Sequence, residues 1–288
     1  MFSIKRSEKI GIVGLGLIGG SLGIDLQRLG HKVYGLTNRE ITANKAKKRG
    51  LAQVISTDPK IISECSLVII ALPLEKLLNP KKSLITALPP NAVITDVGSV
   101  KTPVIKVWEK LHPRFVASHP MAGTNKAGVE AGKQNLFKTK PWIATPNEKT
   151  DQEALEIVRQ LAISIGSQWL TTDSYSHDHA VALISHLPVF IGASLIKSIS
   201  NHEKGIVRNL AQTIASTGFT DTSRVGGGNP ELGVAMARYN TSNILESLEK
   251  YQQALENIKE CIKSENWTKL EEELKDTQKL RADFLERS

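Results

Sequence analysis

A short apolar run near the start of the chain leads directly into a glycine-rich turn. Residues 9–13 have the composition of a strand, and Gly14, Gly16 and Gly19 follow in the spacing Gly-x-Gly-x-x-Gly before a helical pattern begins. In such a unit the first glycine allows the tight turn, the second lets the backbone approach a pyrophosphate, and the third lets the helix pack on the strand. The pattern predicts a βα unit that binds a dinucleotide at the N-terminus of its helix. A glycine-rich turn that binds no ligand is the alternative interpretation.

Strand-like and helical patterns alternate through the first half of the chain. The expected strands cover residues 9–13, 32–36, 66–71, 92–96, 115–117, 142–145 and 168–170, and the expected helices end near residue 30 or cover 41–49, 102–111 and 151–165. Strands that alternate with helices form parallel sheets covered on both faces. The sequence therefore predicts an α/β domain with a doubly wound parallel sheet over residues 1–172.

The pattern changes beyond residue 172, where no strand alternation continues. Helices are expected over residues 180–196, 207–216, 240–263 and 268–286, so residues 173–288 are predicted to form a second, all-helical domain. The first of these helices is apolar on nearly all faces, which is typical of a membrane span or of a helix buried inside a domain or between subunits. Ser185, His186 and Pro188 argue against a membrane span. We therefore expect no membrane partner, and a homodimer with this helix at its core.

The overall composition is that of a soluble globular protein, with 40% hydrophobic and 23% charged residues in a chain of 288. Cys65 and Cys261 lie far apart and in no metal-binding motif. The formal net charge of +8 comes from lysines spread along the chain, so we expect a small polyanionic ligand and no nucleic acid partner. The first residues do not resemble a secretion signal or a transit peptide, and a cytoplasmic location is predicted.

The strand expected at residues 32–36 ends about twenty residues after the glycine turn, where an NAD-binding protein usually places an acidic residue on the ribose 2′-hydroxyl. Thr37, Asn38 and Arg39 follow this strand instead. None of the three repels a 2′-phosphate, and a guanidinium can pair with it directly. The sequence therefore predicts NADP as the cofactor. The alternative for Arg39 is a solvated residue at the start of the next helix.

The residues predicted to bind the cofactor follow neighbouring strands, because ligands of open parallel sheets bind beyond the carboxyl ends of the strands. They are Gly14, Leu15, Gly16, Leu17, Ile18, Gly19, Thr37, Asn38, Arg39, Ala71, Leu72 and Pro73.

The loops after the strands at 92–96 and 115–117 carry reactive side chains. Ser99 lies in the first loop, and His119 lies in the second, directly before Pro120. Proline favours an extended backbone for the residue before it, which would project the imidazole from the end of the strand. A histidine can accept a hydroxyl proton while hydride leaves the adjacent carbon, and Ser99 could hydrogen-bond to the same group. The alternative for His119 is a loop residue that satisfies a local carbonyl.

Three histidines in the second half of the chain raise the question of a metal site. They are His177, His179 and His186. The last two are seven residues apart, which is about 10 Å along a helix and too far for both to bind one ion. No metal is predicted.

Several motifs occur together along the chain. They are the glycine turn at 14–19, Asp-Val-Gly-Ser-Val-Lys at 96–101, His-Pro-Met-Ala-Gly at 119–123, Ser-His-Leu-Pro at 185–188 and Gly-Phe-Thr-Asp-Thr-Ser-Arg at 218–224. In this order they resemble the arogenate/prephenate dehydrogenase family of tyrosine biosynthesis over nearly the whole chain. The likeness is greatest to its short, cyanobacterial-type arogenate dehydrogenases.

The resemblance implies a Rossmann-like N-terminal domain, a helical C-terminal domain that forms the homodimer, and an active site in the cleft between them. By motif match, His119 accepts the proton of the ring 4-hydroxyl with the assistance of Ser99. Arg224 matches the arginine that holds a carboxylate of the dicarboxylate substrate, and His186 matches a histidine that helps to position the substrate. Hydride transfer and loss of the ring carboxylate as carbon dioxide would then leave an aromatic phenol.

Two further residues are predicted to contribute to substrate binding. Thr124 ends the loop that carries His119, and Asp221 precedes Arg224 by three residues and could orient it. A solvated loop carboxylate is the alternative for Asp221. The glycine-rich segment 226–230 is interpreted as a connector between helices, and a flexible turn beside the site is the alternative.

One departure from the family pattern bears on the substrate. In many members that use prephenate the Ser-His-Leu-Pro motif is followed by another histidine, whereas here Val189 and Phe190 follow it. Loss of this polar partner favours arogenate, which carries an ammonium group on its side chain, over prephenate, whose keto group could use a donor. The alternatives are a prephenate dehydrogenase, a different NADP-dependent oxidoreductase and an NADP(H) sensor without turnover. The last two would not require His119, Ser99 and Arg224 together.

Overall fold

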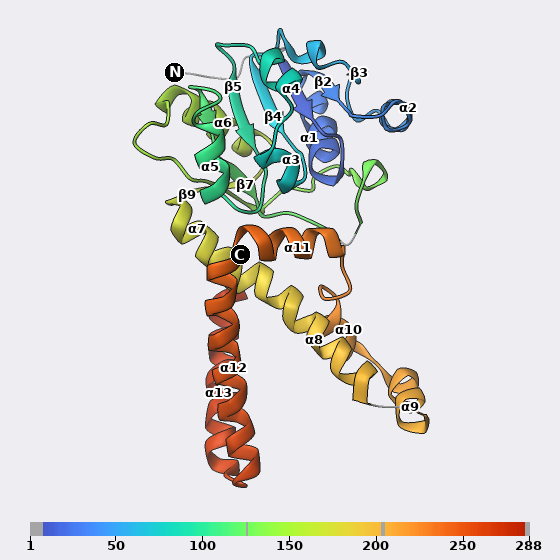
Figure 1. Cartoon of the computed structure of the whole chain (residues 1–288), viewed down its shortest axis with the longest axis vertical. Coiled ribbons are helices and arrows are strands. Elements are labelled where there is room, and N and C mark those ends of the chain that lie inside the picture. The colour runs from blue at the N-terminus through green and yellow to red at the C-terminus, as the bar shows by residue number, and fades with distance from the viewer. Residues whose placement is uncertain (1–7, 125, 203–204, 286–288) are drawn as a thin grey trace.

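The computed structural model describes residues 8–124, 126–202 and 205–285. Figure 1 shows an upper part in which helices cover both faces of a sheet, and a lower part of long helices that extends away from it. The chain passes from the upper to the lower part between β9 (Gln168–Thr171) and α7 (Ser174–Val181).

The upper part is organised around a six-stranded parallel sheet with the strand order β3-β2-β1-β4-β5-β6. Its strands are β1 (Lys9–Val13), β2 (Lys32–Leu36), β3 (Val54–Ser56), β4 (Leu67–Ile70), β5 (Val93–Asp96) and β6 (Phe115–Val116). Ile12, Ile69 and Ile94 are fully buried, as expected for strands covered on both faces. The strand order reverses between β1 and β4, where ligands of open α/β sheets bind.

Helices pack against both faces of this sheet. The helices on one face are α1 (Leu17–Arg28), α2 (Glu40–Lys48) and α6 (Gln152–Ser164), and those on the other are α3 (Leu74–Leu78), α4 (Lys82–Ala87) and α5 (Thr102–Trp108). A 3-10 turn at Pro59–Ile62 joins the second group. Leu26 and Leu161 are buried in the first layer, and Leu77 and Trp108 in the second. The predicted doubly wound sheet is confirmed.

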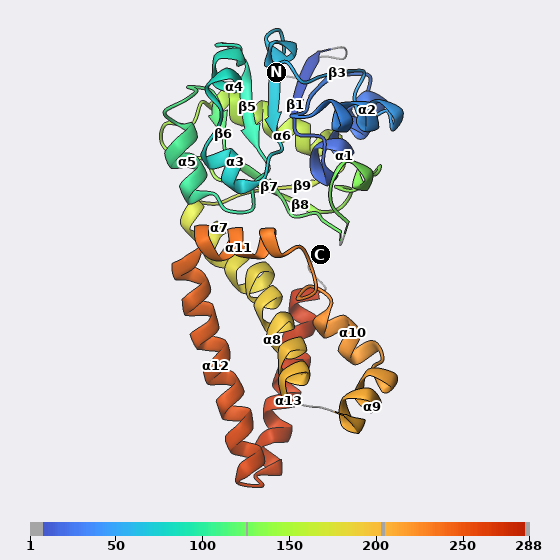
Figure 2. The ribbon, with the colours of Figure 1, turned by 45° about the vertical axis from the view of Figure 1, so that its right-hand side comes forward.

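A second sheet of three strands lies below the first in Figure 2. It contains β7 (Ser118–Pro120), β8 (Pro141–Ala144) and β9, and β7 is antiparallel to β8. The strand expected over 115–117 ends at Val116, and His119, which was expected in a loop, lies in the separate strand β7 opposite Ile143. The loop assignment was wrong because the strand is created by pairing with a segment distant in the sequence. A short 3-10 turn at Val129–Ala131 lies between β7 and β8.

The lower part is entirely helical in the residues that the structure describes, which confirms the predicted helical C-terminal domain. After α7 come α8 (Leu187–His202), α9 (Ile206–Ile214), α10 (Thr217–Ser223), α11 (Pro230–Tyr239), α12 (Thr241–Lys263) and α13 (Trp267–Leu285). Residues Ala182–His186 form a π-turn between α7 and α8, so that one helix continues through all three segments. In Figures 1 and 2, α11 lies directly beneath the sheet part, and α12 and α13 form a long hairpin.

The segment Ser174–Ser200 of this continuous helix is long and apolar enough to cross a membrane, by length and composition only. Ala182 and His186 are fully buried within the protein, whereas Leu183 and Ile184 are 39% and 59% exposed. The helix is therefore covered on one face by its own chain and uncovered on another.

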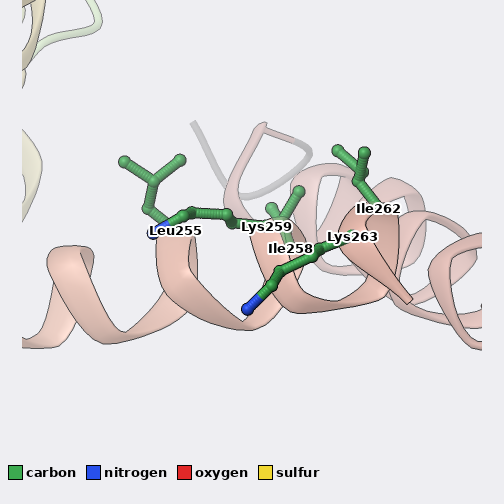
Figure 3. Close-up of a pocket in the computed structure, with 5 residues that line it drawn as sticks. All are labelled: Leu255, Ile258, Lys259, Ile262 and Lys263. Carbon is green, nitrogen blue, oxygen red and sulfur yellow. The ribbon is translucent and has the colours of Figure 1, made fainter. Parts of the chain in front are cut away.

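The helical part exposes many large apolar side chains beyond this segment. They include Ile206, Val207, Leu210, Ile214, Leu255, Ile258, Ile262, Trp267, Leu274 and Leu280. Figure 3 shows the residues of α12 that line a pocket, which are Leu255, Lys259, Ile258, Ile262 and Lys263. The buried core of this part is small, with Ala182, Met236 and Ile244 at its centre. Exposed apolar surface on this scale is typical of a protein interface.

Candidate active site

Titratable and hydrogen-bonding side chains lie close together where the sheet part meets the helical part. His119 lies on β7, and α7 contributes His177 and Asp178 from below it. The π-turn ends at His186, and Asn240 lies between α11 and α12. All five side chains are buried. The candidate site is therefore built by elements from both parts of the molecule.

A chain of hydrogen bonds joins three of these residues. His119 Nδ1 lies 3.0 Å from His177 Nε2, and His177 Nδ1 lies 2.8 Å from Asp178 Oδ1. The two imidazole rings meet edge to face, with centroids 5.2 Å apart and planes inclined by 72°. His119 Nε2 makes no hydrogen bond to any residue in the described part of the chain. It is the ring nitrogen that remains for a ligand.

Asp178 is anchored by the backbone at the start of α5. Its Oδ1 accepts a hydrogen bond from Lys101 N at 2.7 Å, and its Oδ2 accepts one from Thr102 N at 2.8 Å. Burial raises the pKa of Asp178, but the hydrogen bonds from His177 and from these backbone groups lower it, and the net pKa lies below its ordinary value. The carboxylate is therefore ionised at neutral pH, and it joins a helix of the helical part to a helix of the sheet part.

A fully buried ion pair lies beside the hydrogen-bonded residues His119, His177 and Asp178. Lys101 Nζ contacts Asp96 Oδ2 and donates a hydrogen bond to Ser118 O at 2.7 Å. Asp96 also accepts hydrogen bonds from Gly98 N at 2.7 Å and Ser118 N at 3.2 Å. Burial raises the pKa of Asp96 and lowers that of Lys101, and the attraction between the two groups opposes both shifts. The pair holds β7 against β5 at the residue before His119.

His186 is held by Asn240. The Nδ2 of Asn240 donates to Asp178 O at 2.7 Å and lies 3.3 Å from His186 Nδ1. Because an amide nitrogen can only donate, His186 Nδ1 accepts, and the hydrogen of the neutral ring lies on Nε2. This Nε2 is buried and has no hydrogen-bond partner among the described residues. His186 therefore presents a buried N–H donor that a ligand could satisfy.

Burial keeps His119 and His186 neutral. Burial and then the neighbouring His177, Lys101 and His186 lower the pKa of His119 well below 6.5. Burial lowers the pKa of His186 to about 4, opposed by Asp178 and assisted by His177. At neutral pH the ring of His119 can therefore accept a proton, and the ring of His186 can donate a hydrogen bond without carrying charge.

Ser99 lies half-buried in the loop between β5 and α5. Its hydroxyl makes no hydrogen bond within the part of the chain that the structure describes. Thr95 Oγ1 lies 2.9 Å from Ser118 Oγ, which joins β5 to β7. The loop that carries Ser99 and the strand that carries His119 therefore start from neighbouring positions.

The glycine turn has the geometry that a dinucleotide site requires. A Cβ on Gly14, whose φ is +95°, would lie 2.3 Å from Ala71 O, and a Cβ on Gly19 would lie 1.9 Å from Gly14 O. A Cβ on Gly16 would meet no atom within 4 Å, so its backbone borders open space. Helix α1 begins at Leu17 with no side-chain cap and no acidic residue in its first turn. Free N–H groups at a helix N-terminus suit a pyrophosphate, and the residues here fit the pyrophosphate of a dinucleotide.

The other predicted cofactor residues surround this turn. Leu15 is buried and Pro73 is exposed, whereas Leu17, Ile18, Ala71 and Leu72 are partly buried. At the end of β2, Thr37 is buried and its Oγ1 donates to Arg39 O at 3.4 Å. Asn38 and Arg39 are exposed. Both remain accessible at the strand end where a ribose would lie.

The predicted substrate residues outside the buried cluster are exposed. Arg224 follows α10, and neither it nor Asp221 makes a hydrogen bond or an ion pair within the described residues. The segment after Arg224 packs on α8, since a Cβ on Gly226 would lie 2.1 Å from Ala193 N. Thr124 is also exposed, and its Oγ1 accepts from Lys126 N at 3.2 Å. The hydrogen bonds of the cluster connect His119 and His186 but not these three residues.

The sequence did not identify every member of the cluster as a site residue. Its patterns indicate His177 only as a candidate metal ligand, and no motif marks Asp178 or Asn240. The adjacent His-Asp pair is a usable signal, but its link to His119 spans 58 residues and does not follow from spacing. The described residues include no group of three or more His, Cys, Asp or Glu side chains arranged to hold a metal ion.

Comparison with known proteins agrees with this arrangement. Residues 22–170 match the model of the prephenate dehydrogenase nucleotide-binding domain, and residues 173–276 match the model of the prephenate dehydrogenase dimerization domain. The chain is 31% identical over 279 residues to a cyclohexadienyl dehydrogenase of Zymomonas mobilis. The aligned region covers 95% of each protein.

Two solved structures are similar over nearly their whole length. The arogenate dehydrogenase of Synechocystis is 40% identical, with a TM-score of 0.83 and coverage of 96% of this chain and 100% of that one. The prephenate dehydrogenase of A. aeolicus, in complex with hydroxyphenyl propionate and NAD+, is 28% identical, with a TM-score of 0.90 and coverage of 98% and 100%. Motifs, fold, domain matches and relatives agree, and the chain belongs to the prephenate/arogenate dehydrogenase family.

Proposed function

We propose that this protein oxidises and decarboxylates arogenate to tyrosine and uses NADP. The observation that carries the proposal is the buried, neutral His119, whose Nδ1 is held by His177 while its Nε2 remains unbonded. Such a nitrogen can accept the proton of the ring hydroxyl as hydride leaves the same carbon. NADP, when bound, supplies the hydride acceptor. The ring carboxylate leaves as carbon dioxide, and the ring becomes a phenol.

Other side chains would orient the substrate around His119. The Nε2–H of His186 is a buried donor without a partner among the described residues, which suits a substrate carboxylate or hydroxyl oxygen. Ser99 follows β5, next to the strand of His119, and would hydrogen-bond to the same substrate hydroxyl. The exposed Arg224 would pair with a substrate carboxylate through two parallel hydrogen bonds, and Asp221 and Thr124 would also contribute to substrate binding.

The preference for arogenate rests on the residues that follow Pro188. Val189 and Phe190 are partly buried against the apolar cluster of Ala182, Met236 and Ile244. Neither side chain offers a hydrogen-bond donor to a keto group. The 40% identity to the Synechocystis arogenate dehydrogenase is consistent with this preference.

The preference for NADP rests on the end of β2. The first acidic residue after this strand is Glu40, and its Oε1 accepts a hydrogen bond from Thr57 Oγ1 at 2.5 Å. The carboxylate is therefore engaged with the segment after β3, and Arg39 is exposed and able to pair with a 2′-phosphate. The A. aeolicus relative was solved with NAD+, so the two nucleotides must be compared directly.

The proposal is tested by a spectrophotometric assay of reduced nucleotide with arogenate and prephenate, each with NADP and with NAD. We expect the highest kcat/KM with arogenate and NADP, and weaker use of NADP by Arg39→Ala. A higher kcat/KM with prephenate would replace the proposed substrate, and a preference for NAD would overturn the proposed cofactor. If Arg39→Ala uses NADP as well as the wild type does, Arg39 does not bind the 2′-phosphate.

Replacing Arg224 by alanine is expected to raise KM by about 10- to 100-fold, because a charge-assisted hydrogen-bonded pair contributes roughly 1.5–3 kcal/mol. The effect on kcat should be smaller, since the carboxylate is held in the ground state as well as the transition state. The control is Arg159→Ala, which removes an exposed arginine of α6 that pairs with Glu156. Steady-state kinetics decide the point, and an unchanged KM would place Arg224 outside the substrate site.

We propose further that residues 1–172 and 173–288 form the two domains and that the protein is a cytoplasmic homodimer. The exposed apolar side chains of α9, α12 and α13 and the dimerization-domain match at 173–276 support this assembly. Light scattering at micromolar concentration should give twice the chain mass of 31.5 kDa. A monomer under these conditions would contradict the proposed dimer.

A further inference from the structure

The hydrogen bonds around Asp178 determine which nitrogens of the two neighbouring histidines carry hydrogen. Backbone N–H groups can only donate, so both oxygens of Asp178 act as acceptors toward Lys101 N and Thr102 N, at 2.7 and 2.8 Å. The carboxylate also contacts His177 Nδ1, at 2.8 Å. This nitrogen must therefore donate and carry a hydrogen.

The assignment continues from His177 to His119. A neutral imidazole carries hydrogen on one nitrogen only, so His177 Nε2 is an acceptor once Nδ1 donates. His119 Nδ1 lies 3.0 Å from it and must be the donor in that hydrogen bond. The hydrogen of a neutral His119 ring is then on Nδ1, and the lone pair is on Nε2.

The assignment applies to a His177 ring that carries one hydrogen. Its side chain is fully buried, and the charged groups that face the cluster are Asp178 from the same helix and the Lys101–Asp96 pair from the sheet part. His119 and His186 are the other titratable neighbours, and burial keeps both neutral. A second hydrogen on His177, at Nε2, would make that nitrogen the donor and reverse the hydrogen bond to His119 Nδ1.

We propose that His177 and Asp178 are positioning residues that fix His119 as the Nδ1–H tautomer, so that Nε2 is the nitrogen that accepts the substrate proton. With hydrogen on Nε2 instead, His119 would offer a donor to the substrate hydroxyl and could not remove its proton. In Ser-His-Asp hydrolases, loss of the carboxylate that sets a histidine tautomer costs about 10⁴-fold in kcat. The catalytic consequence rests on the proposed function, whereas the tautomer itself does not.

The tautomer is measured by ¹⁵N NMR of the ring nitrogens in the full-length protein without substrate, with His119→Asn used to assign its signals. We expect a protonated Nδ1 and an unprotonated Nε2 for His119, and the same pattern for His177. Hydrogen on Nε2 of His119, or a doubly protonated His177, would overturn the proposal. This measurement needs no turnover and leaves His177 and Asp178 unchanged, so its result is valid whether or not the proposed reaction is found.

The kinetic test uses His177→Phe, which keeps a ring but removes the acceptor for His119. We expect kcat to fall at least about 10-fold, by less than in His119→Ala, with little change in KM. The matched control on the same helix is His179→Phe, because His179 is partly exposed and its Nδ1 lies 4.0 Å from Glu246. This control should retain the wild-type kcat.

A double variant separates positioning from general damage to the fold. If His177 acts only through His119, His119→Ala/His177→Phe should be no slower than His119→Ala alone. Independent, multiplying losses in the double variant would overturn the positioning role. If the wild type turns over neither arogenate nor prephenate with either nucleotide, the proposed function fails, and the NMR result still decides the tautomer.

Discussion

Replacing His119 by alanine is expected to lower kcat by about 10²- to 10⁴-fold, because a positioned proton acceptor contributes this much to a reaction rate. Substrate should still bind, since His186 and Arg224 are unchanged, and KM should move far less than kcat. His119→Asn is the more selective variant, because its amide can still donate to His177 Nε2 but offers no acceptor in place of His119 Nε2. A near-normal kcat in either variant would exclude His119 as the proton acceptor.

The same residue determines the expected pH dependence. His119 accepts a proton only when neutral, so activity is lost as the pH falls through its pKa. Burial, with His177, Lys101 and His186, lowers this pKa well below 6.5. We therefore expect the acid limb of kcat/KM to lie below pH 6.5 in the wild type. An acid limb above that value would show that another group controls the rate.

Replacing Lys101 by methionine is expected to destabilise the protein by about 3–5 kcal/mol, because it leaves the buried carboxylate of Asp96 without its counter-ion. Neither member of this pair has any exposed side-chain surface. The measurement is the free energy of unfolding in urea. Lys106→Met is the matched control on α5, where the side chain is exposed and the change should stay within about 0.5 kcal/mol.

A second variant attributes this loss to the unpaired charge. In Lys101→Met/Asp96→Asn the charge is removed, and the amide oxygen can still accept from Gly98 N, as Asp96 does at 2.7 Å. The double variant should recover part of the lost stability. A loss below about 1 kcal/mol in Lys101→Met would contradict the assigned role of the ion pair.

The sequence was most informative where one local pattern carries the whole signal. The apolar runs of β1 and β4 are buried on both faces of the sheet, and their alternation with helices predicts parallel strands. The glycine turn also follows from a short motif: a Cβ would clash with Ala71 O at Gly14 and with Gly14 O at Gly19, whereas the backbone at Gly16 borders open space. Strand β3 and helices α3 and α4 were not predicted, since segments of three to six residues show little periodicity.

The candidate site was predicted only in part, for a related reason. His119 could be recognised from its motif, but its place in β7 depends on pairing with Ile143. Its partner His177 is 58 residues away and reaches it from a helix of the other part. Contacts of this kind arise from packing between distant segments, which neither periodicity nor motif spacing contains.

The π-turn at Ala182–His186 changes which residues of the long helix can act together. His177 and His186 are nine residues apart, and at ~100° per residue a regular α-helix would point them in opposite directions, about 180° apart. The wider turn takes up roughly one extra residue, which brings the two directions to about 80° of each other. The turn thus rotates the side chains that follow it about the helix axis, relative to those that precede it. It lets one helix supply the partner of His119 and the donor at His186 to a single cluster, whereas a regular α-helix with the same number of residues would turn the two histidines away from each other.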